Sequence, residues 1–476
     1  MTDPVGALEY HRLTVHRPDR SRPADPRLVH GFQPMRWDRK PPQFKTYPGL
    51  GTDLLPDTLD AGGLDRQGLG RLLFLSAGVV RAMPARAGPL WFRAAGSAGN
   101  LGPVEVYVLT GDVDGLAAGL YHYEPVEHGL VRLRGAPPGT PPALVLTGVP
   151  WRTGWKYGER GFRHLWWDAG TMLAHVLALA GEAGWCPYVE LGFVDAEVAA
   201  LVGAQRPHEL PLAVVGLDDR PALPEAEPVV AGHVAGDLFE FPLVTAAYRA
   251  GELHSAAAVA AWRDAATGAG VPAGAGGGVA LTEPLDRVVR RRGSTRAFDC
   301  TATAGRDVLH AALPRAATPV PADAMAEGAT LLAHLVLVFA VEGVDPGAYR
   351  LEGGRLAPLG AGDLRAVGRH LCLDQALGGD GAFTVFHCSD LEAVVGRLGD
   401  RGYRAALLEA GIVEGRLHLA AAALGLGATG LTYYDDEVRR FFATELAPLL
   451  VTAVGVAAYR ARPAGTPRRP VLMRAR

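Results

Sequence analysis

The segment over residues 151–170, WRTGWKYGERGFRHLWWDAG, carries the side chains best suited to proton transfer. Lys156 and Tyr157 are adjacent there and lie among four tryptophans, Trp151, Trp155, Trp166 and Trp167. Aromatic neighbours keep water away from a lysine, which lowers its pKa and makes it a usable base near neutral pH. The alternative is the start of a surface helix, whose amphipathic side chains pack along their apolar stems.

A basic segment, RRRGSTRAFD, stands at the start of the second half of the chain. Arg292, Ser294 and Arg296 alternate in it, followed by the apolar Phe298. A phosphate group needs cationic forks and hydroxyl donors that converge from one loop, and arginine suits bidentate contact. The segment therefore predicts either a phosphate site or a solvated basic run before a strand.

Two glycine-rich segments are candidates for contact with a flat ligand. In RAAGSAGNLGP, Ser97, Gly99 and Asn100 precede a buried strand and form either a ligand-binding loop or an ordinary turn. GLGATG, residues 425–430, matches the dinucleotide pattern GxGxxG. That fingerprint follows a strand and opens a helix, whereas these glycines close a helix and lead into a strand. We reject a dinucleotide site and expect small residues that let a flat ring approach the backbone.

The elements that must position these residues occur twice along the chain. The run VEVYVL and the segment after it match LVLVFA and its continuation. Each is typical of a buried strand, a Gly/Asp turn and a hairpin strand, with Tyr121 and Tyr349 in equivalent places. Repetition in the same order predicts two related modules in one chain.

A second pair of matching blocks begins at Asp168 and at Glu414. Each predicts an apolar helix of about four turns that ends at a glycine, then an extended segment, a short helix and a terminal strand. Both long helices are apolar on all sides, which predicts that they are buried against each other. The glycines are Gly184 and Gly425, and the short helices start at Asp195 and at Asp435/Asp436.

The remaining segments set the domain organisation. Residues 1–60, rich in Pro, Arg and His, predict an extended arm without regular structure, laid over a surface. Module 1 is expected over 61–265, ending in an Ala-rich helix over 243–265, and module 2 over 281–476. The Gly/Ala-rich stretch 266–280 between them is typical of a flexible linker. The fold class is therefore α+β, with two tandem modules forming an intramolecular pseudo-dimer.

Composition excludes several classes of function. The 47 Lys and Arg residues nearly balance 50 Asp and Glu residues, which argues against nucleic-acid binding. No apolar run reaches the roughly 20 residues that cross a bilayer, and no signal peptide is evident, so we expect a cytoplasmic protein. The four cysteines are scattered, and no metal-binding motif occurs, His11 and His16 included.

These motifs together resemble the FMN-dependent nitroreductase-like proteins, in particular the azoline dehydrogenase branch. The resemblance covers most of the chain from about residue 70, and both halves are similar to family members. In that family an R-x-S-x-[KR] run binds the FMN phosphate, a PSAG-like loop contacts the flavin, and a Lys–Tyr pair is the proposed acid/base element. The matching residues here are Arg292, Ser294 and Arg296 for the phosphate, Ser97, Ala98, Gly99 and Asn100 for the loop, and Lys156 and Tyr157 for catalysis.

The resemblance also implies weaker matches and two departures. Thr429 and Gly430 would lie nearest the isoalloxazine, and Arg468 and Arg469 match a basic pair near the family's carboxyl terminus. The first half has no R-x-S-x-R run, and the second half has no PSAG-like loop before LVLVFA. Family members are dimers that bind flavin between subunits, so the resemblance implies one complete site and one degenerate site at the seam of the pseudo-dimer.

The implied reaction is the oxidation of a thiazoline or oxazoline to an azole in natural-product peptide biosynthesis. Lys156 or Tyr157 would remove the Cα proton while hydride passes to the flavin, which O2 then reoxidises. The implied partners are an azoline-containing peptide and a cyclodehydratase or other biosynthetic enzyme. Two alternatives stay open: an NAD(P)H-dependent nitro- or quinone reductase, and a non-catalytic partner of a peptide-cyclising complex.

Overall fold

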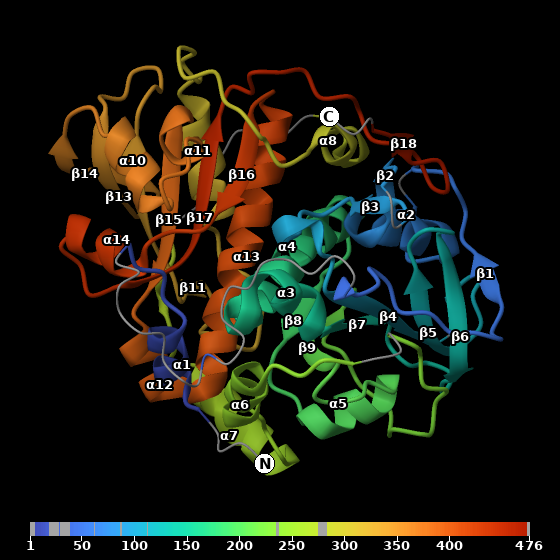
Figure 1. The fold of residues 1–476 in the computed structure, drawn as a ribbon. Helices are drawn as coiled ribbons and strands as arrows, with labels where there is room; N and C mark the ends of the chain where they lie inside the picture. Colours follow the sequence, from blue (N-terminus) through green and yellow to red (C-terminus); the bar gives the residue numbers. More distant parts are fainter. Residues whose placement is uncertain are drawn as a thin grey trace.

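The repeat in the sequence corresponds to two antiparallel sheets, one in each half of the chain (Figure 1). The computed structural model describes residues 5–18, 28, 39–60, 62–85, 88–111, 113–234, 238–274 and 283–473. The first sheet has the strand order β1-β6-β5-β4-β7-β9-β8, and the second has the order β14-β13-β12-β15-β17-β16. Without the edge strand β1, the two orders match strand for strand. The α+β class and the two tandem modules are therefore confirmed.

The strand bounds are as follows. The first sheet contains β1 Thr52–Leu54, β4 Val104–Thr110, β5 Gly119–Glu124, β6 Gly129–Gly135, β7 Ala143–Gly148, β8 Tyr188–Glu190 and β9 Leu210–Gly216. The second contains β12 Ala333–Val338, β13 Gly347–Glu352, β14 Arg355–Ala361, β15 Phe383–Ser389, β16 Gly427–Leu431 and β17 Ala447–Gly455. Two small sheets pair β18 Val471–Leu472 with β2 Val79–Met83 and β3 Leu90–Arg93, and β10 Val271–Pro272 with β11 Ala329–Thr330.

Tyr121 and Tyr349 occupy the same structural position, as their sequence context predicts. Each lies at a register shift between the two strands of a hairpin, which are β5 and β6 in the first module and β13 and β14 in the second. Each hydroxyl donates to a carbonyl four residues earlier, at 2.7 Å, on Ala117 and Asp345 respectively. The repeat therefore extends to the details of the strand pairing.

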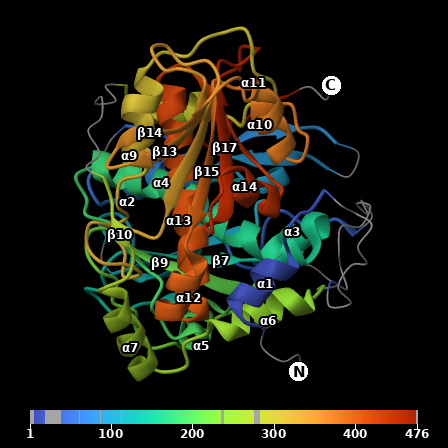
Figure 2. The ribbon, with the colours of Figure 1, turned by 90° about the vertical axis from the view of Figure 1, so that its left-hand side faces the viewer.

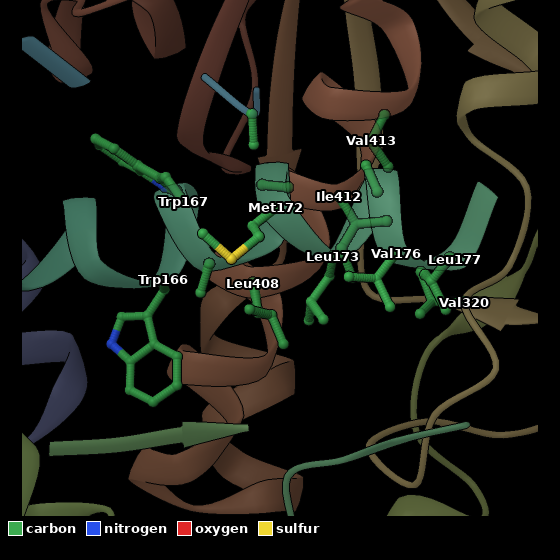
Figure 3. Close-up of a cluster of buried hydrophobic side chains, with 14 of the residues drawn as sticks. Trp166, Trp167, Met172, Leu173, Val176, Leu177, Val320, Leu408, Ile412 and Val413 are labelled. Carbon is green, nitrogen blue, oxygen red and sulfur yellow. The ribbon is translucent and has the colours of Figure 1, made fainter. Parts of the chain in front are cut away.

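Two long helices, α4 Gly161–Glu182 and α13 Asp400–Ala423, pack against each other between the sheets (Figures 1 and 2). Both are longer than the four turns expected from the sequence. The predicted ends at Gly184 and Gly425 are confirmed, since both glycines have positive φ just after the helix. Figure 3 shows apolar side chains of both helices in one cluster, including Leu173 of α4 and Ile412 of α13. The prediction that the two helices bury each other is confirmed.

Glycines set how closely α4 and α13 approach. A Cβ on Gly170 would lie 2.3 Å from the Leu408 carbonyl oxygen, and one on Gly411 would lie 2.4 Å from the Trp167 carbonyl oxygen. These contacts are reciprocal, so Gly170 and Gly411 are equivalent residues of the two modules. This register pairs Asp168 with Glu409, five residues before the Glu414 at which sequence comparison began the second block.

Charged pairs repeat the same symmetry across the seam. Asp195, at the start of α5 Asp195–Val202, pairs with Arg401 at 2.7 Å and Arg404 at 3.0 Å from α13. Asp435, at the start of α14 Asp435–Phe441, pairs with Arg163 of α4 at 3.0 Å. Each module therefore binds the short helix of the other, as in a symmetric dimer interface.

The N-terminal segment differs from the predicted irregular arm. Residues Ala7–Leu13 form the helix α1, which lies against α12 Leu391–Leu398 and α13 (Figure 2). Tyr10 of α1 is fully buried and donates to the Glu159 carbonyl, and the His16 amide donates to Asp435. Apolar side chains spaced along ALEYHRL make a buried helical face, which the Pro- and Arg-rich composition of the arm obscured. Most of residues 19–38 lie outside the described chain.

The predicted helix over 243–265 is two helices, α6 Pro242–Ala250 and α7 Ala256–Ala266. Between them the Leu253 amide donates to the Asp195 carboxylate, and the Ser255 side chain caps α7. These contacts need a non-helical backbone, so the helix breaks there. Within the predicted linker 266–280, residues 271–272 form β10, and residues 275–280 lie outside the described chain.

The other helices are short, and several of them pack against α4 or α13. They are α2 Arg66–Ala77, η2 Ala98–Asn100, α3 Pro150–Tyr157, η3 Gly158–Arg160, α8 Leu285–Arg291, η4 Val308–Ala312, α9 Leu313–Ala316, α10 Arg365–Leu371 and α11 Leu377–Asp380. Among the helices of the described residues, none combines the length and apolar character needed to cross a membrane.

Candidate functional site

The loop from Ala94 to Asn100 is the centre of the candidate site. Its last residues form the single turn η2, in which Gly99 and Asn100 have φ of +60° and +56°. Asp168 of α4 anchors the loop: its carboxylate accepts from the Ser97 hydroxyl at 2.6 Å and from the Ala98 amide at 2.9 Å. Burial raises the pKa of Asp168 to about 7. A small pocket beside the loop is lined by Ser97, Asp168 and Met172 among others.

Lys156 and Tyr157 lie against the tip of this loop. They end the helix α3, which Pro150 begins. A Cβ placed on Gly99 would lie 2.9 Å from the Tyr157 hydroxyl oxygen and 3.0 Å from Lys156 Nζ. Both polar atoms therefore lie where a side chain at Gly99 would stand. The structure thus joins the predicted acid/base pair to the predicted ligand-binding loop.

The surroundings of Lys156 and Tyr157 shift their pKa values in opposite directions. Burial lowers the pKa of Lys156. Burial, followed by the nearby Asp168, raises the pKa of Tyr157 above its usual range. The Tyr157 ring stacks on His164 with centroids 3.9 Å apart, and Trp167 meets His164 edge-on at 4.7 Å. Trp166 and Trp167 belong to the core around α4 (Figure 3), so the pair is backed by a histidine, with tryptophan behind it.

Arg292 of the second module binds the other end of the same loop. Its Nη2 and Nε donate to the Ala94 carbonyl oxygen at 2.7 and 3.1 Å, and the side chain is buried. Burial, with Arg81 nearby, lowers the pKa of Arg292 to about 10. Nη1 lies beside Gly96 and has no hydrogen-bond partner within the part of the chain that the structure describes. A buried cationic donor without an acceptor is suited to an anionic group such as phosphate.

Ser294 and Arg296 extend from Arg292 along the strand β16. Ser294 forms a parallel bridge with Ala428, and the Thr295 amide donates to the Ala428 carbonyl at 2.9 Å. Arg296 is exposed, and its amide donates to the Tyr459 hydroxyl. The three motif residues thus follow one extended segment, with the first buried at the seam and the third at the surface.

Thr429 and Gly430 lie on β16, next to the carboxylate of Glu414. Thr429 is buried, whereas Gly430 is exposed. A Cβ on Gly430 would lie 2.1 Å from Glu414 Oε1, so a larger residue here would require the Glu414 side chain to move. β16 follows α13, which agrees with the rejection of a dinucleotide fingerprint at residues 425–430.

Arg468 and Arg469 make their contacts away from Arg292 and Ser294. The Arg468 guanidinium donates to the Leu55 carbonyl at 2.9 Å and pairs with Asp57 at 3.1 Å. Arg469 is exposed, and its backbone bridges Thr466. The structure therefore gives Arg468 partners in the first module, and these contacts do not join it to Arg292 or Ser294.

The second module repeats the carboxylate anchor of the candidate site's loop. Glu409 accepts from the Thr330 hydroxyl at 2.6 Å and from the Leu331 amide at 2.9 Å, as Asp168 does from Ser97 and Ala98. The sequence prediction that the second half lacks such a loop is correct for its glycine and asparagine. It is also correct for the turn, because Leu332 and Ala333 lack the positive φ of Gly99 and Asn100 and Ala333 already begins β12. Only the carboxylate anchor is shared by the two modules.

The position around β8 that corresponds to the Arg292 segment is filled by protein. Val189 of β8 bridges Ala322, as Ala428 of β16 bridges Ser294. The Asp323 carboxylate then accepts from the Leu191 and Gly192 amides at 2.7 and 3.0 Å, and it pairs with Arg263 at 3.0 Å. A protein carboxylate therefore takes both backbone donors at this position.

Several residues of the site were not singled out from the sequence. Asp168 and Glu414 are buried carboxylates on the long helices α4 and α13, and a carboxylate within an apolar-rich stretch of helix is the signal that could have identified them. Glu409 is the counterpart of Asp168 in the second module and lies outside the site. Among the described residues, no group of three or more His, Cys, Asp or Glu side chains is arranged to hold a metal ion.

Comparison with known proteins agrees with the fold. No protein-family profile matches the chain. A protein of Methanocaldococcus jannaschii, provisionally named the nitroreductase MJ1384, is 29% identical over 126 residues, which are 23% of this chain and 64% of that protein. The chain therefore spans less than two thirds of that relative's length.

Among solved structures, a protein of Anabaena variabilis provisionally assigned as a nitroreductase superposes with a TM-score of 0.77 at 24% identity. The match covers 96% of this chain and 100% of the other, so the two share one fold over nearly their whole length. A chain of the E. coli microcin synthetase McbBCD complex matches 45% of this chain and 82% of its own, with 20% identity and a TM-score of 0.28. That score is too low to support an argument.

Proposed function

We propose that this chain is an FMN-dependent dehydrogenase that oxidises thiazoline or oxazoline rings of peptides to azoles. The observation that carries the proposal is the arrangement at the seam. One loop of the first module is contacted at its tip by Lys156 and Tyr157 and at its base by Arg292 of the second module. A base and a phosphate-binding cation therefore flank the same short segment.

The residues present fit FMN at this seam. The buried Nη1 of Arg292, without a partner in the described chain, suits a phosphate oxygen, and Ser294 and Arg296 continue the cationic segment. When bound, FMN supplies the acceptor for the hydride of the oxidised substrate. The protein's own task is to orient the azoline ring and to hold the groups that take up its proton.

Lys156 is the proposed base, and Tyr157 the proposed hydrogen-bond donor. Because burial lowers the pKa of Lys156, a larger share of its amine is neutral and able to accept the Cα proton. Because burial raises the pKa of Tyr157, its hydroxyl keeps its proton and can donate to the substrate. The ring loses one proton and one hydride and becomes aromatic, which makes the step favourable.

One FMN per chain is the proposed stoichiometry. At the pseudo-symmetric position, Asp323 already accepts from the Leu191 and Gly192 amides, and Arg263 pairs with both Asp323 and Glu190. The substrate is a peptide that a cyclising enzyme, such as a cyclodehydratase, has already converted to the azoline.

The test begins with a visible spectrum of the purified protein and a flavin count per chain. An azoline-containing peptide is then incubated with the protein, and mass spectrometry should show a loss of about two mass units, the two hydrogens removed. A colourless protein that binds no added FMN, or an unchanged peptide mass with the flavin-loaded protein, would refute the proposal. The colourless result would instead favour a non-catalytic partner of a cyclising complex.

A reductase is the second candidate, because the M. jannaschii relative is provisionally named a nitroreductase. On the same scaffold, NAD(P)H would reduce the flavin, which would then reduce a nitro compound or quinone. Rapid bleaching of the bound flavin by NADPH, together with an unchanged azoline peptide, would select this activity. Slow bleaching and loss of two mass units would select the dehydrogenase.

A further inference from the structure

Asp168 binds the loop that Lys156 and Tyr157 contact at one end and Arg292 at the other. It lies in α4, and its carboxylate accepts from the Ser97 hydroxyl and the Ala98 amide. The Ser97 oxygen in turn accepts from the Gly102 amide at 2.9 Å. A single buried carboxylate therefore ties both ends of the turn that presents Gly99.

The turn also has two backbone bonds of its own: the Asn100 amide donates to the Ser97 carbonyl at 3.0 Å, and the Leu101 amide donates to the Ala98 carbonyl at 3.3 Å. Two consecutive residues, Gly99 and Asn100, are in the left-handed region, which non-glycine residues such as Asn100 adopt at a cost. External hydrogen bonds add to these: the Asn100 side chain donates to the Trp91 carbonyl at 2.9 Å, and the Gln43 side chain donates to the Asn100 carbonyl at 3.1 Å. The bonds from Asp168 are the ones that reach the side of the turn facing α4.

The position of Gly99 decides where Lys156 and Tyr157 can lie. Lys156 Nζ and the Tyr157 hydroxyl are within 3.0 Å of the point where a Gly99 Cβ would stand. A shift of the turn by about 1 Å would release both groups or push them aside, and misplacement on this scale can cost a reaction roughly a hundredfold in rate.

We propose that Asp168 is a positioning residue for the Lys156–Tyr157 pair, acting through the Ser97–Gly102 turn. This inference rests on the proposed function for its effect on turnover. The effect of Asp168 on the turn is independent of that function and can be measured with no substrate present. The charged groups nearest Asp168 are Glu414 of α13 and Arg93 of β3, and neither makes these two bonds.

The pseudo-symmetry of the chain supplies a matched control. Glu409 of α13 makes the same two bonds to Thr330 and Leu331 in the second module, where the neighbouring position is filled by Asp323 and Arg263. Asp168→Asn and Glu409→Gln each replace one acceptor oxygen by an amide group in a buried carboxylate cap. Only Asp168→Asn should affect the site. Ser97→Ala is a milder second variant that leaves the Ala98 bond in place.

The first measurement is structural. Hydrogen exchange of the full-length protein should accelerate over residues 97–102 in Asp168→Asn and over 330–332 in Glu409→Gln. The rate of Lys156 acylation by an amine-reactive reagent, followed by peptide mass spectrometry, should rise several-fold in Asp168→Asn and Ser97→Ala. It should stay within about twofold of wild type in Glu409→Gln. Unchanged exchange and acylation in Asp168→Asn would overturn the positioning role, whatever reaction the protein catalyses.

The second measurement is kcat for azoline oxidation with flavin saturating. We expect Asp168→Asn to lose about tenfold or more, Ser97→Ala to lose less, and Glu409→Gln to keep the wild-type value within twofold. A wild-type kcat in Asp168→Asn, or an equal loss in Glu409→Gln, would contradict the inference. A wild-type protein that oxidises no azoline refutes the proposed function alone, and the exchange and acylation results then decide the positioning role.

Discussion

Asp195 and Asp435 begin equivalent short helices in the two modules, and each is bound by arginines from the long helix region of the other module. Arg401 and Arg404 pair with Asp195, while Arg163 and, at 3.4 Å, Arg160 pair with Asp435. All of these side chains are buried. The contacts connect residues more than 200 positions apart, so the two modules form one cooperative structure.

We expect Asp195→Asn and Asp435→Asn each to lower the free energy of unfolding by about 3–5 kcal/mol, because removing one member leaves buried arginines without a counter-charge. Denaturant unfolding of each purified variant measures the change. Glu437→Gln on the same helix, which breaks an exposed pair with Arg440, is the control and should leave the midpoint nearly unchanged. A similar midpoint in all three variants would mean that the buried pairs do not stabilise the seam.

Arg292 should be required for flavin binding. Charge-assisted hydrogen bonds contribute about 1.5–3 kcal/mol, so Arg292→Ala should weaken FMN binding roughly tenfold to a hundredfold. Fluorescence titration of the apoprotein with FMN checks this value. Arg416→Ala removes a half-buried arginine, which donates to the Thr318 carbonyl in the second module, and should bind FMN as the wild type does. Equal weakening in both variants would point to general destabilisation.

Lys156 and Tyr157 should differ in their effect on turnover. Lys156→Met should keep the yellow colour and lower kcat by about 10²–10⁴, the usual contribution of a general base. Tyr157→Phe should lose less, because the lysine still takes the proton. In the wild type, kcat should rise with pH as Lys156 loses its proton at a lowered pKa. That rise should be absent from the residual activity of Lys156→Met, and full turnover in the double variant would exclude this base.

The buried carboxylates Asp168 and Glu409 should make the protein less stable as pH rises. Burial raises the pKa of each to about 7, while an unfolded chain has the ordinary values near 4. Between pH 4 and 7 only the folded state holds these protons, so the free energy of unfolding falls by up to about 1.4 kcal/mol per pH unit for each group. Above pH 7 neither state holds them, and this contribution becomes constant.

Urea midpoints measured at pH 5 and pH 7.5 test this linkage. Asp168→Asn and Glu409→Gln are neutral at both pH values, so each variant should show a smaller drop in stability than the wild type. Glu392→Gln, which changes an exposed carboxylate on α12, should show the wild-type drop. An unaltered drop in Asp168→Asn and Glu409→Gln would mean that these groups are ionised in the folded protein throughout the range.

The repeat, the fold class and the carboxyl-terminal ends of the two long helices follow from the amino-acid sequence alone. These features depend on local patterns: a glycine after an apolar helix, alternating apolar strand residues, and a tyrosine after a Gly/Asp turn. The same local reasoning identified Lys156 and Tyr157, the Ser97–Asn100 loop and the Arg292 segment as candidates. It missed α1, because the surrounding Pro- and Arg-rich composition hid one short amphipathic helix.

Which of these parts meet depends on how the chain folds in three dimensions. The register that pairs Asp168 with Glu409 is set by Gly170 and Gly411, where the two helix backbones touch, and no local pattern records such a contact. The same holds for Asp323, whose carboxylate fills the second position from a distant segment. Hydrophobic periodicity reports the side of a helix that is buried, whereas the partner of a buried charge depends on how the chain closes in space. The candidate site depends on this closure, because a loop of one module meets an arginine of the other there.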